Sequence, residues 1–354
     1  MTAHAAPQTY AHDRVEKLVT AILVGLGLPE GDARRSAQCL VLADLRGVAS
    51  HGVGRLPIYA DRIRQGLINA TPSLTLEEPM PAAARLDGDN GFGFVVATKA
   101  MNEAVERASR YGIGMVSAYH STHFGMAACY LLQAIEKGYA AFVLTNASPA
   151  MPVWGGSRPF LGTSPFAFGA PGAEGLPPIV LDMATSVVAR GKIRRAAANG
   201  ESIPEGWALD KDGRPTTDAQ AGYDGIVLPL GGPKGSGLSL MMEVMAGVVS
   251  GAAYGGQVRN QYFDFDTPQN VGHTMIAIKP DLFEPDYGAR MADLVTRAKA
   301  EPLVDETQPI LMPGEPEGLR EAQRRKTGIA LPAEDLAGLR SEAEKAGVDF
   351  GSYL

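Results

Sequence analysis

Residues 44–69 read DLRGVASHGVGRLPIYADRIRQGLIN, and this stretch combines a titratable imidazole with a carboxylate-binding cation. If the segment is helical, His51, Arg55 and Tyr59 follow one another at steps of four and lie on one face beside Ser50. The imidazole can exchange a proton near neutral pH, and the guanidinium one turn away can hold a carboxylate in bidentate fashion. The pattern therefore suits a small acidic substrate. In the alternative interpretation, Ser50 only caps a helix and the other side chains form its solvated face.

Apolar spacing on either side of this stretch indicates an α/β fold. Five residues at helical spacing, Val15, Leu18, Val19, Ile22 and Leu23, predict a first helix, and Asp32 is the expected cap of a second one. Further along, strand-like and helical segments alternate. Strands are predicted near 84–88, 112–118, 140–146, 165–171 and 178–184, and helices at 95–110, after 125, at 238–249, at 286–300 and after Pro316 and Pro332; the glycine- and proline-rich segment 200–237 is expected to be a long ordered loop.

Composition limits the classes of partner. The chain has 354 residues, 45% hydrophobic and 20% charged, which is typical of a globular protein with two or more lobes. The formal net charge of −7 disfavours nucleic acid and anionic membranes as partners. No membrane span or signal peptide is recognisable, so we expect a cytoplasmic protein. Cys39 and Cys129 lie in apolar helical patterns, which favours reduced, buried thiols over a disulfide or a metal site.

Neither glycine-rich segment matches a standard nucleotide-binding motif. Gly25, Gly27 and Gly31 follow a helical pattern rather than a strand and are typical of a helix C-cap. The GGPKGSG segment at 231–237 has its lysine in the wrong place for a phosphate-binding P-loop. The sequence therefore contains no Rossmann or Walker fingerprint.

Several longer blocks, together with residues 44–69, carry a resemblance to a known family. They are STHFGMAACY at 121–130, TNASPAMPVWGG at 145–156, LGTSPFAFGAP at 161–171, IVLDMATSVVARGKI at 179–193, IPEGWALDKDGRPTTD at 203–218 and PLGGPKGSGLSLMMEVMAG at 229–247. In this order they resemble the type-2 malate/L-lactate dehydrogenases, a sulfolactate dehydrogenase-like family unrelated to the Rossmann-fold lactate and malate dehydrogenases.

The resemblance implies an architecture. It predicts a non-Rossmann NAD(P)-binding α/β domain with a mixed sheet, at residues 81–255. A largely helical lobe would be formed by residues 1–80, which carry the catalytic histidine, and by residues 256–354, which pack back on them. The resemblance also implies a homodimer with no metal.

The resemblance further implies that NAD or NADP is the cofactor. The residues just after Glu315 are proline and an acid rather than the guanidinium that an adenosine 2′-phosphate would want, which favours NAD slightly. Residues 123–125, His-Phe-Gly, form what we call the HFG turn, and its backbone N–H groups could face phosphate or ribose. The Lys234 ammonium could neutralise the pyrophosphate. The positions carried over as cofactor contacts are His123, Phe124, Gly125, Asn146, Ala147, Thr163, Asp182, Met183, Ala184, Lys234 and Gly235.

Oxidation of a 2-hydroxy acid needs a base for the hydroxyl proton and a cation for the carboxylate. We assign His51 as the first candidate base, Ser50 as the residue that orients it, and Arg55, with Tyr59, as substrate-binding. His123 is the second candidate, because the family places it beside the nicotinamide, where it could donate to the carbonyl oxygen.

Lys192 discriminates between substrates. Its ammonium could polarise a keto oxygen or anchor a second carboxylate, whereas imine-reducing members of the family carry an acidic residue there. The predicted activity is interconversion of a 2-hydroxy acid and its 2-oxo acid, such as malate, lactate or sulfolactate. The alternatives are a reductase of cyclic imino acids or diketo sugar acids, and a non-catalytic ligand-binding relative.

Overall fold

The computed structural model describes residues 8–354, and a mixed seven-stranded sheet forms its centre. The strand order is β2 (Thr75–Met80), β3 (Ala83–Asp87), β4 (Ile113–Ser121), β11 (Val271–Ile278), β5 (Ala140–Thr145), β6 (Phe166–Ala170) and β7 (Ile179–Met183). Strands β3 and β4 are parallel, and the other neighbours in this sheet pair antiparallel. The predicted α/β class with a mixed sheet is thereby confirmed.

The N-terminal helices and those that cover the sheet share one large hydrophobic core. They are α1 (His12–Gly25), α2 (Glu30–Leu45), α3 (Leu56–Arg64), α4 (Gly93–Tyr111) and α5 (Ala128–Ile135). All five apolar residues that predicted the first helix are fully buried on α1. The prediction for Asp32 was wrong: it lies in the first turn of α2, and Pro29 is the N-cap. Proline restricts φ before the helix but offers no side-chain acceptor to the first-turn N–H groups, so α2 begins without a side-chain cap.

The segment that contains His51 is not the continuous helix that its spacing predicts. It forms two 3₁₀ turns, η1 (Ala49–His51) and η2 (Val53–Arg55), before α3 begins. The break falls at Gly52, whose backbone is extended (φ −87°, ψ −162°). The Asp44 carboxylate accepts a hydrogen bond from the Val53 N–H (2.8 Å), and it lies so close to Gly52 that a Cβ there would collide with it. A buried carboxylate thus takes the place of the helical hydrogen bonds.

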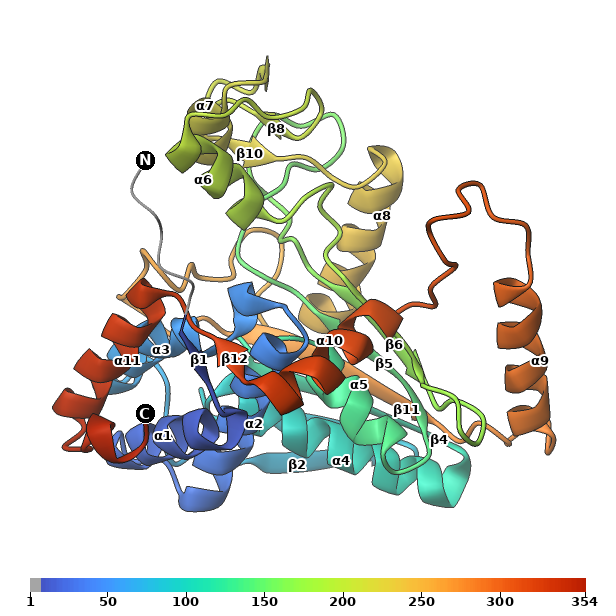
Figure 1. Cartoon of the computed structure of the whole chain (residues 1–354). Coiled ribbons are helices and arrows are strands. Elements are labelled where there is room, and N and C mark those ends of the chain that lie inside the picture. The colour runs from blue at the N-terminus through green and yellow to red at the C-terminus, as the bar shows by residue number, and fades with distance from the viewer. Residues whose placement is uncertain (1–7) are drawn as a thin grey trace.

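A smaller lobe has its own core, and Figure 1 shows it at the top of the molecule. It contains α6 (Arg190–Asn199), α7 (Ala219–Asp224) and a three-stranded sheet of β8 (Ala208–Leu209), β9 (Pro215–Thr216) and β10 (Ile226–Val227). The predicted ordered loop 200–237 therefore includes short elements. The helix expected from 238 begins earlier, as α8 (Pro233–Met242), and continues as the π-helix η3 (Glu243–Val248).

The C-terminal segment returns to the N-terminal helices. Helix α9 (Tyr287–Lys299) stands at one side of the molecule in Figure 1, and only Val295 of it is buried. Helices α10 (Glu315–Thr327) and α11 (Ala333–Lys345) pack against α2 and against α1 and α3, respectively. Strand β12 (Ile329–Ala330) pairs with β1 (Thr9–Tyr10), and the chain closes with η4 (Phe350–Ser352).

One prediction about cysteine was wrong. Cys39 on α2 and Cys129 on α5 form a disulfide, with their Cα atoms 5.8 Å apart. The apolar pattern correctly indicated that both are buried, at 1% and 2% exposure. It could not show that α2 and α5 pack side by side, which places the two sulfurs in contact. Within residues 8–354, no helix has both the length and the apolar character that a membrane crossing requires.

Candidate active site

The structure brings together Ser50, His51, Arg55, Tyr59 and His123, five of the residues that the sequence singled out. Ser50 Oγ lies 2.9 Å from His51 Nδ1, and the rings of His51 and His123 stack with centroids 5.6 Å apart. Tyr59 reaches the second histidine from α3, with its hydroxyl 2.7 Å from His123 Nδ1. The alternative in which Tyr59 belongs to a solvated face was wrong, because this side chain is 1% exposed.

The hydrogen bonds of His123 fix its tautomer. Its Nδ1 accepts from the backbone N–H of Gly125 (3.2 Å), so that nitrogen carries no proton, and the Tyr59 hydroxyl donates to the same atom. The proton of the neutral ring is therefore on Nε2. His123 thus presents an Nε2–H donor that no residue in 8–354 accepts.

Both imidazoles are held neutral. Burial, followed by the charge of Arg55, lowers the pKa of His51 to about 3. Burial also lowers the pKa of His123 well below its ordinary value, and the charges of Arg55 and His51 add to that effect. At neutral pH His51 is therefore a free proton acceptor, while His123 can act as a hydrogen-bond donor.

Arg55 has a free hydrogen-bonding edge. Its Nε donates to the carbonyl oxygen of Ser50, which fixes the guanidinium beside the first 3₁₀ turn. Its Nη1 is buried and has no hydrogen-bond partner among the described residues. Because a buried N–H without a partner is costly, this atom is suited to an anionic ligand oxygen.

Two residues that sequence reasoning missed support the turn that carries His123. His273 on β11 stacks on Phe124, with centroids 4.6 Å apart, and its two ring nitrogens lie 2.8 Å from Ser121 Oγ and Thr145 Oγ1. Gln269 accepts a hydrogen bond from the His123 N–H through Oε1 (3.2 Å). No sequence signal pointed to His273 or Gln269, because neither belongs to a quoted block and the segment around them is rich in polar residues.

The predicted cofactor positions near the sheet include several with structural partners. Asp182 Oδ2 accepts from the Ala128 N–H at the start of α5 (2.8 Å), and desolvation raises the pKa of its carboxyl group to about 6. Asn146 at the end of β5 bonds Ala253 O (2.6 Å) and the Gly272 N–H (3.0 Å). The N–H groups of Gly125 and Ala128 are thus taken by the protein itself. Thr163, Met183 and Ala184 lie near the end of β7, where the Thr163 carbonyl accepts from the Thr185 N–H (3.1 Å).

Lys234 and Gly235 occupy the first turn of α8. Gly231 and Gly232, with φ of 58° and 64°, precede the helix, and Gly235 is packed so closely on Leu230 and Thr185 that a Cβ would not fit. Lys234 is exposed and forms no ion pair with any residue in 8–354. The first turn itself offers few free N–H groups, because Pro233 has none and those of Gly235 (2.7 Å) and Ser236 (3.2 Å) bond the carbonyls of Leu230 and Gly232. The unpaired ammonium is the group that is chemically suited to a pyrophosphate.

The positions of Lys192 and Ala147 say little about the roles predicted for them. Lys192 lies exposed on α6, beside Ile193, which points into the core of the smaller lobe. Among residues 8–354, no hydrogen bond or ion pair joins Lys192 to His51, His123 or Arg55. Ala147 follows β5, and its backbone packs on Gly162.

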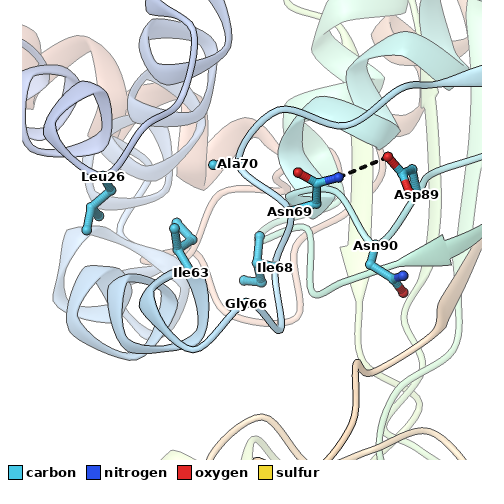
Figure 2. A pocket seen from close by; sticks show the side chains of 8 residues that line it. All are labelled: Leu26, Ile63, Gly66, Ile68, Asn69, Ala70, Asp89 and Asn90. Atoms are coloured by element: carbon cyan, nitrogen blue, oxygen red, sulfur yellow. Dashed lines mark hydrogen bonds between the residues drawn. The ribbon is translucent and has the colours of Figure 1, made fainter.

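An open pocket of about 410 Å³ has neither His51 nor His123 in its lining (Figure 2). Asn69 Nδ2 donates to Asp89 Oδ2 at its edge (2.9 Å). Its lining contains none of the predicted site residues and consists of Leu26, Ile63, Gly66, Ile68, Asn69, Ala70, Asp89 and Asn90.

Two neutral imidazoles beside an unsatisfied guanidinium are chemically suited to proton transfer next to an anionic ligand. Residues 10–340 match the family model described as malate/L-lactate dehydrogenase, and the chain belongs to that family. It is 39% identical over 346 residues to a malate dehydrogenase of Pyrococcus abyssi, covering 95% of this chain and 94% of that protein. The solved structure of sulfolactate dehydrogenase from Methanocaldococcus jannaschii superposes with a TM-score of 0.92 at 34% identity, over 98% of this chain and 99% of that one.

Relatives differ in the cofactor that their names give. A (2R)-3-sulfolactate dehydrogenase (NADP(+)) of Chromohalobacter salexigens is 37% identical over 77% of this chain and 81% of its own length. A ureidoglycolate dehydrogenase (NAD(+)) of Escherichia coli K12 is 38% identical over 77% of both chains. Family membership thus makes this protein an NAD(P)-dependent dehydrogenase that interconverts a 2-hydroxy acid and its 2-oxo acid.

Proposed function

We propose that Arg55 binds the substrate carboxylate, that His51 is the general base for the hydroxyl proton, and that His123 and Tyr59 complete the substrate site. The observation that carries this proposal is the buried, unpartnered Nη1 of Arg55 beside two neutral imidazoles. A carboxylate on Arg55 would bring the adjacent carbon of a 2-hydroxy acid near both rings.

In the oxidation direction, His51 takes the hydroxyl proton while Ser50 holds its Nδ1 and so orients the ring. The Nε2–H of His123 donates to the same substrate oxygen and stabilises negative charge on it. Bound NAD(P), which Lys234 and Gly235 would help to hold, would supply the hydride acceptor for this oxidation. Tyr59 keeps the His123 ring in the donor orientation through its bond to Nδ1.

We further propose that the cofactor is held without a Rossmann fold, across the sheet edge and the start of α8. Lys234 and Gly235 would lie at the pyrophosphate, and the turn at His123, Phe124 and Gly125 would lie near the nicotinamide. The remaining proposed contacts are Asn146, Ala147, Thr163, Asp182, Met183 and Ala184. The choice of NAD stays a prediction, supported by the acidic start of α10, where Glu315 and Glu317 would repel a 2′-phosphate.

The homodimer also stays a proposal, and exposed apolar side chains support it. Along α8 and η3 a group of aliphatic residues is 43–55% exposed: Leu240, Met241, Val244, Val248 and Val249. An apolar face of this kind on a folded protein is typical of an interface. The domain boundaries at 80 and 255, and the role of Lys192 at a second substrate anion, likewise remain proposals.

The experiment is a panel of 2-oxo acids and cyclic imines, each assayed at 340 nm with NADH and with NADPH. Saturable oxidation of a reduced cofactor by a 2-oxo acid, abolished in Arg55→Met, is the expected result. Turnover with imines alone would favour the imino acid reductase instead. No turnover, with cofactor binding retained in a fluorescence titration, would contradict the proposed substrates.

A further inference from the structure

The loop of residues 259–269 is closed at its base and lies against the candidate active site. The N–H of Arg259 donates to Gln269 O (3.4 Å), and Gln269 Nε2 donates back to Arg259 O (3.1 Å). An ion pair between Arg259 and Asp264 (3.3 Å) spans the loop. These bonds make the segment a compact unit rather than a loose connection.

The base of this 259–269 loop is joined directly to the predicted site. Gln269, whose amide closes the loop, also accepts the His123 N–H. The position of the loop and the position of the HFG turn are therefore coupled through one side chain.

A buried arginine fixes the middle of the loop. Arg62 lies on α3 one turn after Tyr59 and is fully buried, and its Nη1 donates to the carbonyl oxygens of Gln261 (3.3 Å) and Asp264 (2.7 Å). Its guanidinium also lies over the ring of Phe265 (5.4 Å). The two carbonyls flank Tyr262 and Phe263, so Arg62 determines where these two aromatic side chains lie.

The two aromatic residues differ in their surroundings. Tyr262 places its ring 5.9 Å from the Arg55 guanidinium. Phe263 is 83% exposed, against 46% for Tyr262. The hydroxyl of Tyr262 makes no hydrogen bond to another residue between 8 and 354.

We propose that Tyr262 is a substrate-contacting residue that forms, with Arg55, the carboxylate end of the site, and that Arg62 is a positioning residue acting through it. This inference rests on the proposed function. The ring restricts the plane of the guanidinium, so that the buried Nη1 points toward the ligand, and it covers one side of the bound carboxylate. Tyr262 then controls substrate affinity, while proton transfer stays with the histidines.

The test compares Tyr262→Ala with Tyr262→Phe and with Phe263→Ala as the matched control. A cation–π contact is worth roughly 1 kcal/mol, so Tyr262→Ala should raise the KM for the 2-oxo acid about fivefold, with kcat within about twofold and cofactor KM unchanged. Tyr262→Phe keeps the ring and should stay within about twofold of wild type. An unchanged KM in Tyr262→Ala, or an equal rise in Phe263→Ala, would overturn the proposal.

Arg62→Lys tests the positioning role, with thermal melting to verify that the variant folds. It should raise the same KM, and the double variant with Tyr262→Ala should be no worse than Tyr262→Ala alone, because both changes act on one contact. Additive effects would remove Arg62 from the proposal.

Equilibrium binding of oxalate to the cofactor-bound protein, measured by calorimetry, separates this inference from the proposed function. A wild type without turnover would sink the proposed function. Weaker oxalate binding by Tyr262→Ala, about fivefold, would still support the role of Tyr262, and equal binding would overturn it.

Discussion

Arg55 has two electrostatic effects on the same site. It offers Nη1 to an anion, and its charge helps to lower the pKa of both His51 and His123. A bound carboxylate would neutralise part of that charge. Substrate binding should therefore raise the proton affinity of His51 when a proton has to be accepted.

The state of His51 can be tested directly by titration. Because its pKa is lowered to about 3, the ring should stay neutral from pH 8 down to about pH 5, whereas an ordinary histidine would be mostly charged at pH 5. NMR of labelled imidazole carbons measures this titration, and the His51 signal is assigned by its loss in His51→Gln. Arg55→Gln should move the midpoint upward. A wild-type midpoint near 6.5 would contradict the assignment.

Loss of the His51 side chain should separate chemistry from binding. His51→Ala should lower kcat by about a hundredfold or more, because general acid–base catalysis typically contributes that much. The cofactor dissociation constant should stay within about twofold. Measuring both kcat and cofactor fluorescence gives the comparison. His120→Ala is the control, because His120 lies on β4, bonds Asp87 (3.0 Å) and makes no bond to His51 or His123 among the described residues. Wild-type turnover in His51→Ala would transfer the proton-transfer role to His123.

At the scale of elements, the 3₁₀ turns that carry His51 and Arg55 depend on acidic neighbours. Asp44 holds the Val53 N–H, and Asp335 of α11 lies so close to Gly54 that a Cβ there would also collide with a carboxylate. Glycine is therefore needed at positions 52 and 54 so that the two carboxylates can come close to the backbone. Backbone conformation is not the reason at Gly52, because its φ is ordinary. A segment from the C-terminal part of the chain thus helps to shape the turn near residue 50.

Asp44 gives this contact a pH dependence. Burial raises the pKa of its carboxyl group to about 7, although the Val53 N–H and Arg324 act in the opposite direction. The folded state then holds a proton that the unfolded state releases near pH 4, so the contribution of Asp44 to stability falls as pH rises from about 4 to 7.

Asp44→Asn keeps an oxygen for Val53 and removes the titration. Its free energy of unfolding, relative to wild type, should be higher at pH 8 than at pH 5 by the order of 1 kcal/mol or more. Urea unfolding at the two pH values measures this, with the exposed Asp212→Asn as control. A difference independent of pH would show that Asp44 is charged throughout.

Some elements could not be predicted from the sequence. The central strand β11 was missed because His273 and Thr274 interrupt its apolar run, yet both are fully buried through side-chain hydrogen bonds to neighbouring strands. The spacing of His51, Arg55 and Tyr59 predicted a helix over residues 50–59. Spacing carries no information about Asp44, whose carboxylate, nine residues before Val53, replaces the helical hydrogen bonds. Amphipathic α1 and α4, whose apolar faces pack on one large core, were predictable for the opposite reason.

At the scale of the whole molecule, the residues that sequence could group are near neighbours along the chain or share a quoted block. Ser50, His51, Arg55 and His123 were found in this way. Tyr262, Gln269 and His273 were not, because the 259–269 loop and β11 reach the site only through tertiary packing. Arg62 lies within the quoted stretch 44–69, but its role was missed because its hydrogen-bond partners come from that distant loop. Contacts between distant segments are set by the fold, which single-sequence patterns do not encode.

The disulfide is such a long-range link, and it predicts sensitivity to reduction. It joins α2, which leads to the His51 turns, to α5, which follows the HFG turn, across 90 residues. Loss of a crosslink of this span typically costs about 2–5 kcal/mol, largely through the greater freedom of the unfolded chain. Cys39→Ala/Cys129→Ala should therefore melt several degrees below oxidised wild type. Dithiothreitol should lower the melting temperature of wild type and leave the double variant unchanged.

Because both sulfurs are buried, labelling by a maleimide should require reductant together with partial unfolding. Two thiols that react in the urea-unfolded protein without reductant would show that the bond is absent.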